Sequence, residues 1–282
     1  MDTRKAIDGQ AIVVMVVLCA TWGMQQVALK ATAADIAPVM QIGLRSGLAA
    51  LLVAGLMRWR AEPMDLRDGT LRPGLAVGAL FALEFVLVAE GLRHTSASHM
   101  VVFLYTAPVF AALGLHWRLP SERLGLRQWA GIALAFGGLA LSFLGPEPGS
   151  PGGPSAQRAA SMLWGDFLGL LAGLSWAATT VVVRCSRLAS APATQTLQYQ
   201  LMSAGAVLLL VAFASGQAQV NFTPQVAASL AFQVVIVSFA SFLAWFWLLR
   251  TYQASRLGVF SFMTPLFGMV FGAWLLNEPL DT

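Results

Sequence analysis

Two charged side chains lie deep inside apolar stretches of this sequence, where they could hold a charged solute. Arg45 is eight residues from the start of the apolar run 37–57, and Glu84 is eight residues from the end of the run 74–92. At a rise of about 1.5 Å per helical residue, both charges lie at a similar depth. An ionised group at the centre of a bilayer costs about 2.5–3.5 kcal/mol, so each needs a partner or a water-filled cavity. Two interpretations stay open: an ion pair that only fixes helix packing, or a site where Glu84 binds a substrate ammonium while Arg45 or a polar backbone binds its carboxylate.

Two tryptophans with polar neighbours form a second group of candidate binding residues. Each has polar side chains three and four positions later, hence on one helical face: Trp22 with Gln25 and Gln26, and Trp176 with Thr179 and Thr180. Amides and hydroxyls need partners in lipid, so these faces are expected to point inward. Their indole rings would offer apolar and cation–π surface to an aromatic or cationic group.

Other aromatic residues give a weaker signal. Tyr105 and Phe260 are candidates for the same binding surface, although aromatic rings are also ordinary lipid-facing packing. Trp245 and Trp247 lie near the end of an apolar run, where we expect them in the aromatic belt at the membrane surface.

Two prolines lie in the middle of apolar runs, where they would act on the backbone. Pro108 and Pro265 each remove an amide donor and clash with the preceding turn, so each helix is expected to kink. Kinks at matching positions could serve as two gates or hinges that open alternately. The alternative is a static kink that only shapes the bundle.

The residues that covalent chemistry needs do not occur together. The three histidines are scattered, and no His-Glu-x-x-His spacing or nucleophile with a nearby base is present. No Gly-x4-Gly-Lys-Ser/Thr segment is present for ATP binding, and the two cysteines are too few for a metal site or a disulfide framework. We therefore expect neither an enzyme nor a cofactor.

Composition places most of the chain in lipid. Hydrophobic residues make up 57% of the sequence and charged residues only 11%, whereas about a quarter of a soluble domain is charged. A bilayer core of about 30 Å needs about 20 apolar residues per helix. Nine runs approach that length: 11–29, 37–57, 74–92, 98–117, 127–144, 162–183, 194–214, 226–249 and 257–276.

The basic residues indicate orientation in the membrane and not nucleic-acid binding. They lie at helix ends, whereas a nucleic-acid surface clusters its basic residues on a polar face with aromatic residues between them. If the N-terminus is inside, 13 of the 17 Lys and Arg residues fall on cytoplasmic segments, and only Lys30, Arg93 and Arg158 fall outside, with Arg45 inside a helix. The positive-inside rule then predicts a multi-pass protein of a bacterial-type inner membrane with a cytoplasmic N-terminus.

The chain repeats itself at a spacing of 157 residues. Eight residues recur at this distance: Leu92, Arg93, Ala97, Ser98, Val102, Phe103, Pro108 and Phe110, as Leu249, Arg250, Ala254, Ser255, Val259, Phe260, Pro265 and Phe267. An odd number of crossings separates the copies, so the repeats are inverted, as in many transporters. We expect a first repeat at 1–144, a Gly/Pro-rich periplasmic linker at 145–161 and a second repeat at 162–282. A tenth helix, equivalent to the fifth, is expected to be absent from this chain.

These features resemble the drug/metabolite transporter superfamily with EamA-type repeats, and most of all its YddG-like amino-acid exporters. The resemblance rests on Thr21-Trp22-Gly23, on Ala-Ser and an intrahelical proline in the fourth and ninth runs, and on an acidic turn after each. It implies an all-α polytopic membrane protein in which inverted five-helix repeats form a ten-helix bundle. Helices one, three, four, six, eight and nine would line a central cavity, with helices five and ten outside it.

The predicted function is therefore secondary transport, with export of aromatic and other small amphipathic amino acids by alternating access. The predicted substrate-binding residues are Trp22, Gln25, Arg45, Glu84, Tyr105, Trp176, Thr180 and Phe260, with hinges at Pro108 and Pro265. Other metabolites or cationic drugs are the alternative cargo, and an intramembrane enzyme or a non-transporting scaffold is the rival class. The expected partners are the substrate and the bilayer. A homo-oligomer could form through the small residues Gly131, Ala135, Gly138 and Ser142.

Overall fold

The chain folds into a bundle of helices. The computed structural model describes residues 5, 7–62, 64, 67–95, 97–143 and 156–276, and their secondary structure is helical apart from two isolated bridge pairs. The longer helices are α1 (Gly9–Ala31), α2 (Pro38–Trp59), α3 (Leu71–Gly91), α4 (Ala97–Leu104), α5 (Ala107–Arg118), α6 (Leu126–Phe143), α7 (Ala156–Cys185), α8 (Ala193–Ala214), α9 (Pro224–Ala231), α10 (Phe242–Thr251), α11 (Ala254–Phe260) and α12 (Met263–Leu276). Two short 3-10 helices, η1 (Pro120–Glu122) and η2 (Arg187–Ala189), and a π-helical segment, η3 (Phe232–Ser241), complete the set.

Local sequence explains several helix starts. The Asp8 carboxylate accepts a hydrogen bond of 2.9 Å from the Ala11 amide at the start of α1, which holds the pKa of Asp8 below its usual range. The Thr223 hydroxyl caps α9 in the same way. Pro38 and Pro224 occupy first helical positions, where the missing amide donor has no helical partner to lose.

Eight of the helical stretches are long and apolar enough to cross a membrane. They are Gly9–Ala31, Pro38–Trp59, Leu71–Gly91, His99–Arg118, Ala160–Cys185, Ala193–Ala214, Pro224–Thr251 and Ala254–Leu275. The ninth predicted run, 127–144, forms α6, a helix of 18 residues. The predicted all-α, multi-pass fold is therefore confirmed.

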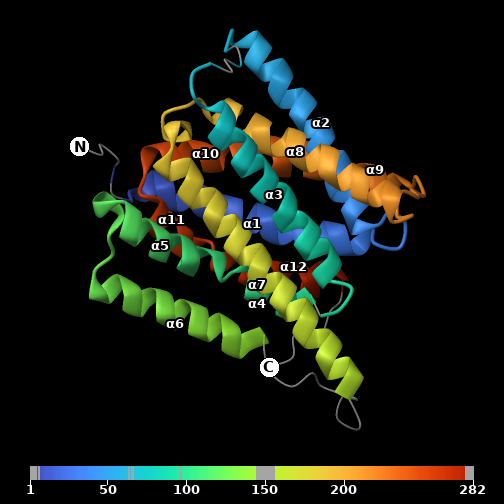
Figure 1. Cartoon of the computed structure of the whole chain (residues 1–282). Helices are drawn as coiled ribbons and strands as arrows, with labels where there is room; N and C mark the ends of the chain where they lie inside the picture. Colours follow the sequence, from blue (N-terminus) through green and yellow to red (C-terminus); the bar gives the residue numbers. More distant parts are fainter. Residues whose placement is uncertain are drawn as a thin grey trace.

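Segments from both parts of the sequence interleave in the bundle. Helix α2 packs along α8, α3 lies between α7 and α8, α1 packs against α12, and α5 packs against α7. Figure 1 shows α6 at the edge of the bundle, away from α1, α3 and α8. The fifth run therefore lies at the periphery, as the resemblance implied.

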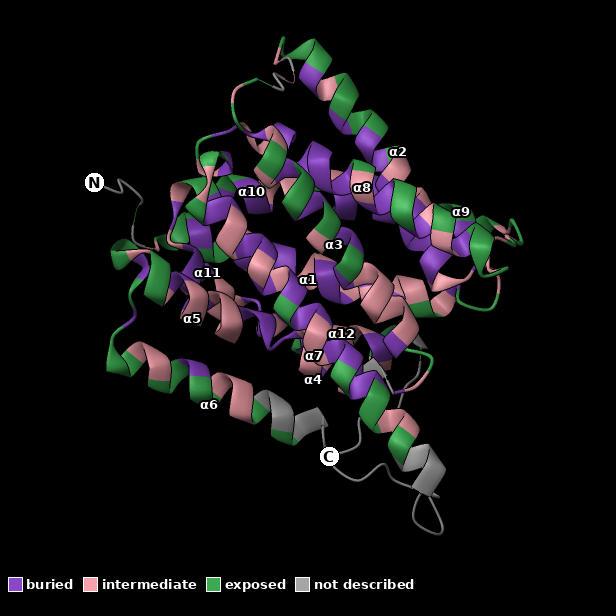
Figure 2. Ribbon diagram, viewed as in Figure 1, coloured by how far each residue is buried: buried purple, intermediate pink, exposed green. Residues whose placement is uncertain are grey.

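Burial follows the pattern of a bundle in lipid. Buried residues gather where helices face one another, and the outer helix faces are exposed (Figure 2). Large apolar side chains cover those outer faces, among them Leu51, Leu134, Phe213 and Trp274. Because lipid chains are as apolar as these side chains, the outer surface needs no further protein cover.

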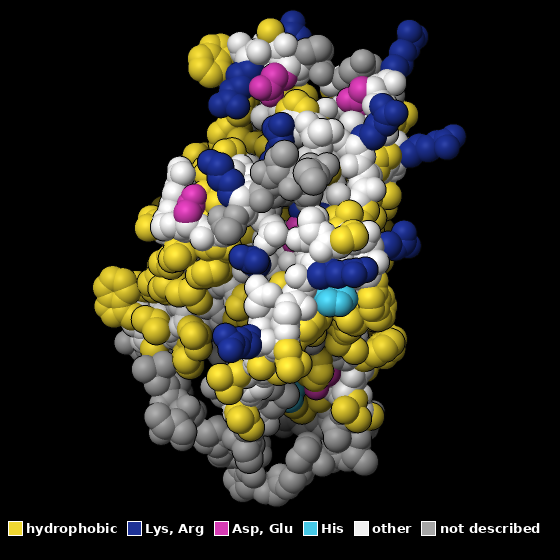
Figure 3. All heavy atoms as spheres, turned by 90° about the vertical axis from the view of Figure 1, so that its left-hand side faces the viewer, with side chains coloured by type: hydrophobic (Ala, Val, Ile, Leu, Met, Phe, Trp, Pro, Cys, Tyr) yellow, Lys and Arg dark blue, Asp and Glu magenta, His cyan; other side chains and the backbone are white. Residues whose placement is uncertain are grey.

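One end of the bundle is rich in basic side chains. Figure 3 looks at the side that carries the N-terminus and the connection between α5 and α6, and Lys and Arg side chains outnumber acidic ones on it. The grouping agrees with the sequence distribution from which the cytoplasmic side was predicted.

Both prolines predicted to kink their helices follow an interruption. The fourth run is divided into α4 and α5 at residues 105–106, and the last into α11 and α12 at residues 261–262. At each break a hydroxyl donates to a carbonyl three residues earlier, Thr106 to Phe103 and Ser261 to Gly258, each at 2.6 Å. The two breaks are thus alike in the two halves of the chain.

Part of the predicted domain plan lies outside the described residues. Helix α7 begins at Ala156, within the range 145–161 predicted as a linker. Residues 144–155 and 277–282 are outside the described part.

Candidate functional site

A central cavity brings together side chains from the first, third, fourth, sixth, seventh and eighth crossings, so the seventh contributes in place of the ninth, which the resemblance implied. Its empty space, including the part open to solvent, is about 760 Å³. Its walls come from α1, α3, the α4–α5 break, α7, α8 and α10. The lining residues are Trp22, Gln25, Gln26, Phe81, Glu84, Phe85, Leu104, Tyr105, Trp176, Thr179, Thr180, Val183, Gln200, Phe242, Trp245, Phe246 and Leu249.

Six of the eight predicted binding residues line this one cavity: Trp22, Gln25, Glu84, Tyr105, Trp176 and Thr180. The other two, Arg45 and Phe260, are not among its lining residues. Phe260 ends α11, and its carbonyl oxygen accepts a hydrogen bond of 3.2 Å from the Cys19 thiol.

Aromatic pairs form two walls of the cavity. The rings of Trp22 and Trp245 meet edge to face at 5.7 Å, and those of Tyr105 and Trp176 at 5.5 Å. The Trp22 indole also donates a hydrogen bond of 3.0 Å to Ser241, the last residue of the π-helical segment. These contacts hold the rings in fixed positions, as a preformed site requires.

The prediction that Trp245 belongs to the aromatic belt is wrong. Its side chain is only 8% exposed and faces the cavity, whereas Trp247 is exposed. Phe242, Trp245, Phe246 and Leu249 follow the i, i+3, i+4, i+7 spacing of one helical face, and all four line the cavity. That spacing is the signal from which the position of Trp245 could have been predicted.

The direct pair expected between Arg45 and Glu84 is not formed. Among the described residues, no ion pair or hydrogen bond joins them, and Glu84 Oε2 is buried without a hydrogen-bond partner. The Arg45 guanidinium instead donates to Gln233 Oε1 at 3.2 Å and lies 5.1 Å from the centre of the Phe85 ring. Equal depth in the membrane was therefore not enough to predict an ion pair, because the hydrogen bond of Arg45 goes to Gln233.

Arg45 belongs to a buried polar chain that runs between helices. Gln233, its partner in the π-helical segment, also donates to Ser229 at 3.0 Å. Gln41 of α2 donates to the same hydroxyl and to Thr32, the residue that follows α1, both at 3.0 Å. These bonds give Arg45 a structural setting outside the cavity, which the sequence did not indicate.

Gln200 is a cavity residue that the sequence analysis did not select. It lies in α8, is 2% exposed, and its Nε2 has no hydrogen-bond partner in the described part of the chain. The available signal was the polar stretch at residues 194–200, where amides and hydroxyls interrupt an otherwise apolar run.

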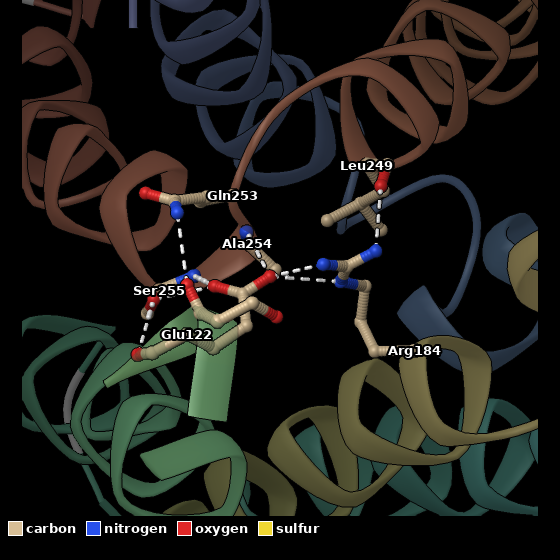
Figure 4. Close-up of polar contacts among 7 residues, drawn as sticks. Glu122, Arg184, Leu249, Gln253, Ala254 and Ser255 are labelled. Carbon is tan, nitrogen blue, oxygen red and sulfur yellow. Dashed lines mark hydrogen bonds and ion pairs between the residues drawn. The ribbon is translucent and has the colours of Figure 1, made fainter. Parts of the chain in front are cut away.

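A buried ion pair lies beside the end of the cavity that Val183 and Leu249 line. Arg184 of α7 donates from Nε to Glu122 Oε1 at 3.1 Å and also from Nη2, and both side chains are fully buried (Figure 4). Arg184 also donates to the Leu249 carbonyl at 3.4 Å. Since Leu249 lines the cavity, the ion pair contacts a residue of the cavity wall.

The same carboxylate caps the start of α11. The backbone amides of Ala254 and Ser255 donate to the two Glu122 oxygens at 3.0 and 3.1 Å, and the Ser255 hydroxyl donates at 2.6 Å (Figure 4). Glu122 thus ties the short helix η1 to α7 and to the N-terminus of α11. The sequence analysis predicted a position on the cytoplasmic side for Arg184 and did not predict its ion pair.

Comparison with known proteins gives a family match over nearly the whole chain. The model of the EamA-like transporter family matches residues 9–144 and 163–282. A solved crystal structure superimposes with a TM-score of 0.75 over 96% of this chain and 90% of the other, at 16% identity. At that identity the structural match shows the fold alone.

Curated relatives from bacteria and an archaeon are uncharacterized transporters. The uncharacterized transporter YoaV of Bacillus subtilis is 23% identical over 261 residues, covering 92% of this chain and 86% of the relative. An uncharacterized transporter of Synechocystis is 26% identical over 281 residues, 93% of this chain and 81% of the relative. An uncharacterized transporter of Archaeoglobus fulgidus is 27% identical over 207 residues, which cover 73% of this chain and 66% of the relative.

Proposed function

Because this chain belongs to the EamA-like transporter family, we propose that it is a secondary carrier that exports amino acids by alternating access through the central cavity. Aromatic and other small amphipathic amino acids are the first candidates. The protein would lie in a bacterial-type inner membrane with its N-terminus in the cytoplasm. The basic end of the bundle supports this orientation, because positive charge favours the cytoplasmic side (Figure 3).

The observation that carries the proposal is the unpartnered Glu84 carboxylate oxygen in an aromatic cavity. A buried acceptor without a partner is costly, and a substrate ammonium would satisfy it. The paired rings of Trp22 with Trp245 and of Tyr105 with Trp176 supply apolar and cation–π surface beside it. A small amphipathic amine fits this combination of one charge and several rings.

The interrupted helices support the alternating part of the mechanism. Each break precedes a proline, Pro108 or Pro265, and at each break a hydroxyl group donates to a backbone carbonyl three residues earlier. Breaks of this kind are places where half-helices can move relative to each other, so the two prolines are the proposed hinges.

Organic cations are a second candidate cargo. Among the residues that line the cavity, Glu84 is the one charged side chain, since Arg45 is held by Gln233 and Phe85 outside it. A site with a single negative charge would also accept a cationic amine that has no carboxylate.

If two copies of the protein associate, we propose that they do so through α6. This helix lies at the edge of the bundle, and Gly131 is exposed on it, so a second copy could approach closely there (Figure 1).

Transport by the purified protein tests the proposed function. The protein is reconstituted into liposomes and offered a panel of labelled amino acids and one labelled quaternary amine, with and without a pH gradient. Flux of aromatic amino acids above that of protein-free liposomes supports the proposal. Flux of the quaternary amine alone supports the second candidate, and no flux of any compound contradicts both.

A further inference from the structure

Gln200 presents an unused hydrogen-bond donor to the cavity. Its side chain is 2% exposed and lines the cavity, and Nε2 has no partner among the described residues. Buried amide donors are almost always satisfied in folded proteins, so an exception inside a binding cavity indicates a group that a ligand satisfies. The acceptor that suits an amide donor best is a carboxylate.

The cavity also presents the opposite kind of unused group. Glu84 Oε2 is a buried acceptor without a partner, and it lies in α3, which packs along α8. One donor and one acceptor, both unsatisfied and both in the same cavity, match the two ends of a zwitterion.

The register of the two helices places these groups one short solute apart. Gly78 of α3 lies against α8 so closely that a Cβ there would fall 2.9 Å from the Tyr199 carbonyl oxygen. Glu84 is six residues further along α3, an axial offset of about 9 Å. Two side chains that leave the backbone about this far apart and line one cavity can bind the two ends of a small zwitterion, each through a hydrogen bond.

We propose that Gln200 binds the carboxylate of the transported amino acid through Nε2, the role that the sequence assigned to Arg45. The inference rests on the proposed amino-acid transport, and it names the residue that distinguishes zwitterions from simple amines. A neutral amide binds a carboxylate less tightly than a guanidinium does, which suits a carrier that must release its substrate.

The test compares two labelled compounds that differ in the carboxylate alone, tryptophan and tryptamine. Wild type, Gln200→Met and the control Gln198→Met are reconstituted into liposomes. Gln198 is a buried amide in the same helix that does not line the cavity. Gln200→Met should weaken the apparent affinity for tryptophan about 10- to 100-fold, the usual range for a hydrogen bond to a charged group, and leave tryptamine transport unchanged. Gln198→Met should change neither.

Thermal unfolding of the same variants separates binding from folding. Because the wild-type Nε2 has no partner, Gln200→Met should not lower the unfolding temperature. An equal loss for both compounds, or no loss for tryptophan, overturns the role of Gln200. A wild-type protein that carries tryptamine but not tryptophan overturns the inference while leaving a carrier in place, and one that carries neither compound overturns the proposed function as well.

Discussion

Arg184 and Glu122 form a fully buried ion pair between the two halves of the chain. Glu122 follows the fourth crossing, and Arg184 lies in the last turn of the first long helix of the second half. The Glu122 carboxylate also accepts hydrogen bonds from the first amides of α11, so three elements meet at one side chain (Figure 4). This pair therefore fixes the relative position of the halves at the Leu249 end of the cavity.

Glu122→Gln should destabilise the protein strongly. The substitution leaves the Arg184 guanidinium buried without its carboxylate, and removal of one partner of a buried pair costs about 3–5 kcal/mol. Thermal unfolding in detergent should show a drop of several degrees. The double variant Glu122→Gln with Arg184→Gln removes both charges and should recover part of the loss. An unchanged unfolding temperature for Glu122→Gln would show that the pair contributes nothing to stability.

Glu84→Gln should reduce transport without reducing the yield of folded protein. Arg45 donates to Gln233 and forms no ion pair with Glu84 among the described residues, so the substitution breaks no direct contact between them, although it removes the carboxylate that attracts the buried guanidinium. The proposed ammonium site would lose its charge, and we expect at least a 10-fold loss of tryptophan flux. Glu90→Gln on the same helix is the control, because Glu90 is partly exposed and bonded to Arg93. Collapse of the Glu84→Gln yield would instead assign Glu84 a structural role.

Replacing either Pro108 or Pro265 with Ala should slow turnover several-fold and leave substrate affinity nearly unchanged. A continuous helix closes its gate less readily, but the cavity side chains stay in place. The control is Pro224→Ala, since Pro224 lies at a helix start. Accessibility of a cavity cysteine, Thr180→Cys, should shift in opposite directions in the two hinge variants. Wild-type turnover with unchanged accessibility in both would leave the prolines with a static role.

Thiol labelling in intact cells tests the orientation. Single cysteines at Arg60 and Gln219, both exposed, are introduced in a Cys185→Ser background. An impermeant maleimide should label the Gln219 variant from outside and the Arg60 variant only after the membrane is broken. The reverse pattern would place the N-terminus outside.

Helices and most of the cavity could be predicted from the sequence. Apolar length locates a crossing, and the spacing of Trp22 with Gln25 and of Trp176 with Thr180 indicates which helical face turns inward. The positions of Pro108 and Pro265 likewise predicted where helices break, because a missing amide acts locally. These are properties of single helices.

Contacts between helices were not predictable in the same way. The prediction of an Arg45–Glu84 ion pair was wrong because counting residues gives the depth of a side chain but not its direction around the helix axis. Gln233 lies in a π-helical segment, whose altered register no periodic pattern indicates. Gln200 was missed because one polar residue in a polar stretch gives no sign of which one faces a cavity.

Counterflow is the measurement that tests the central claim most directly. Proteoliposomes are loaded with unlabelled tryptophan and diluted into a trace of labelled tryptophan outside. A carrier that alternates between two faces returns labelled substrate on each inward step, so label should accumulate transiently above its external concentration and then decay. Label that rises only to equilibrium, or at the rate of protein-free liposomes, would contradict alternating transport of amino acids by this protein.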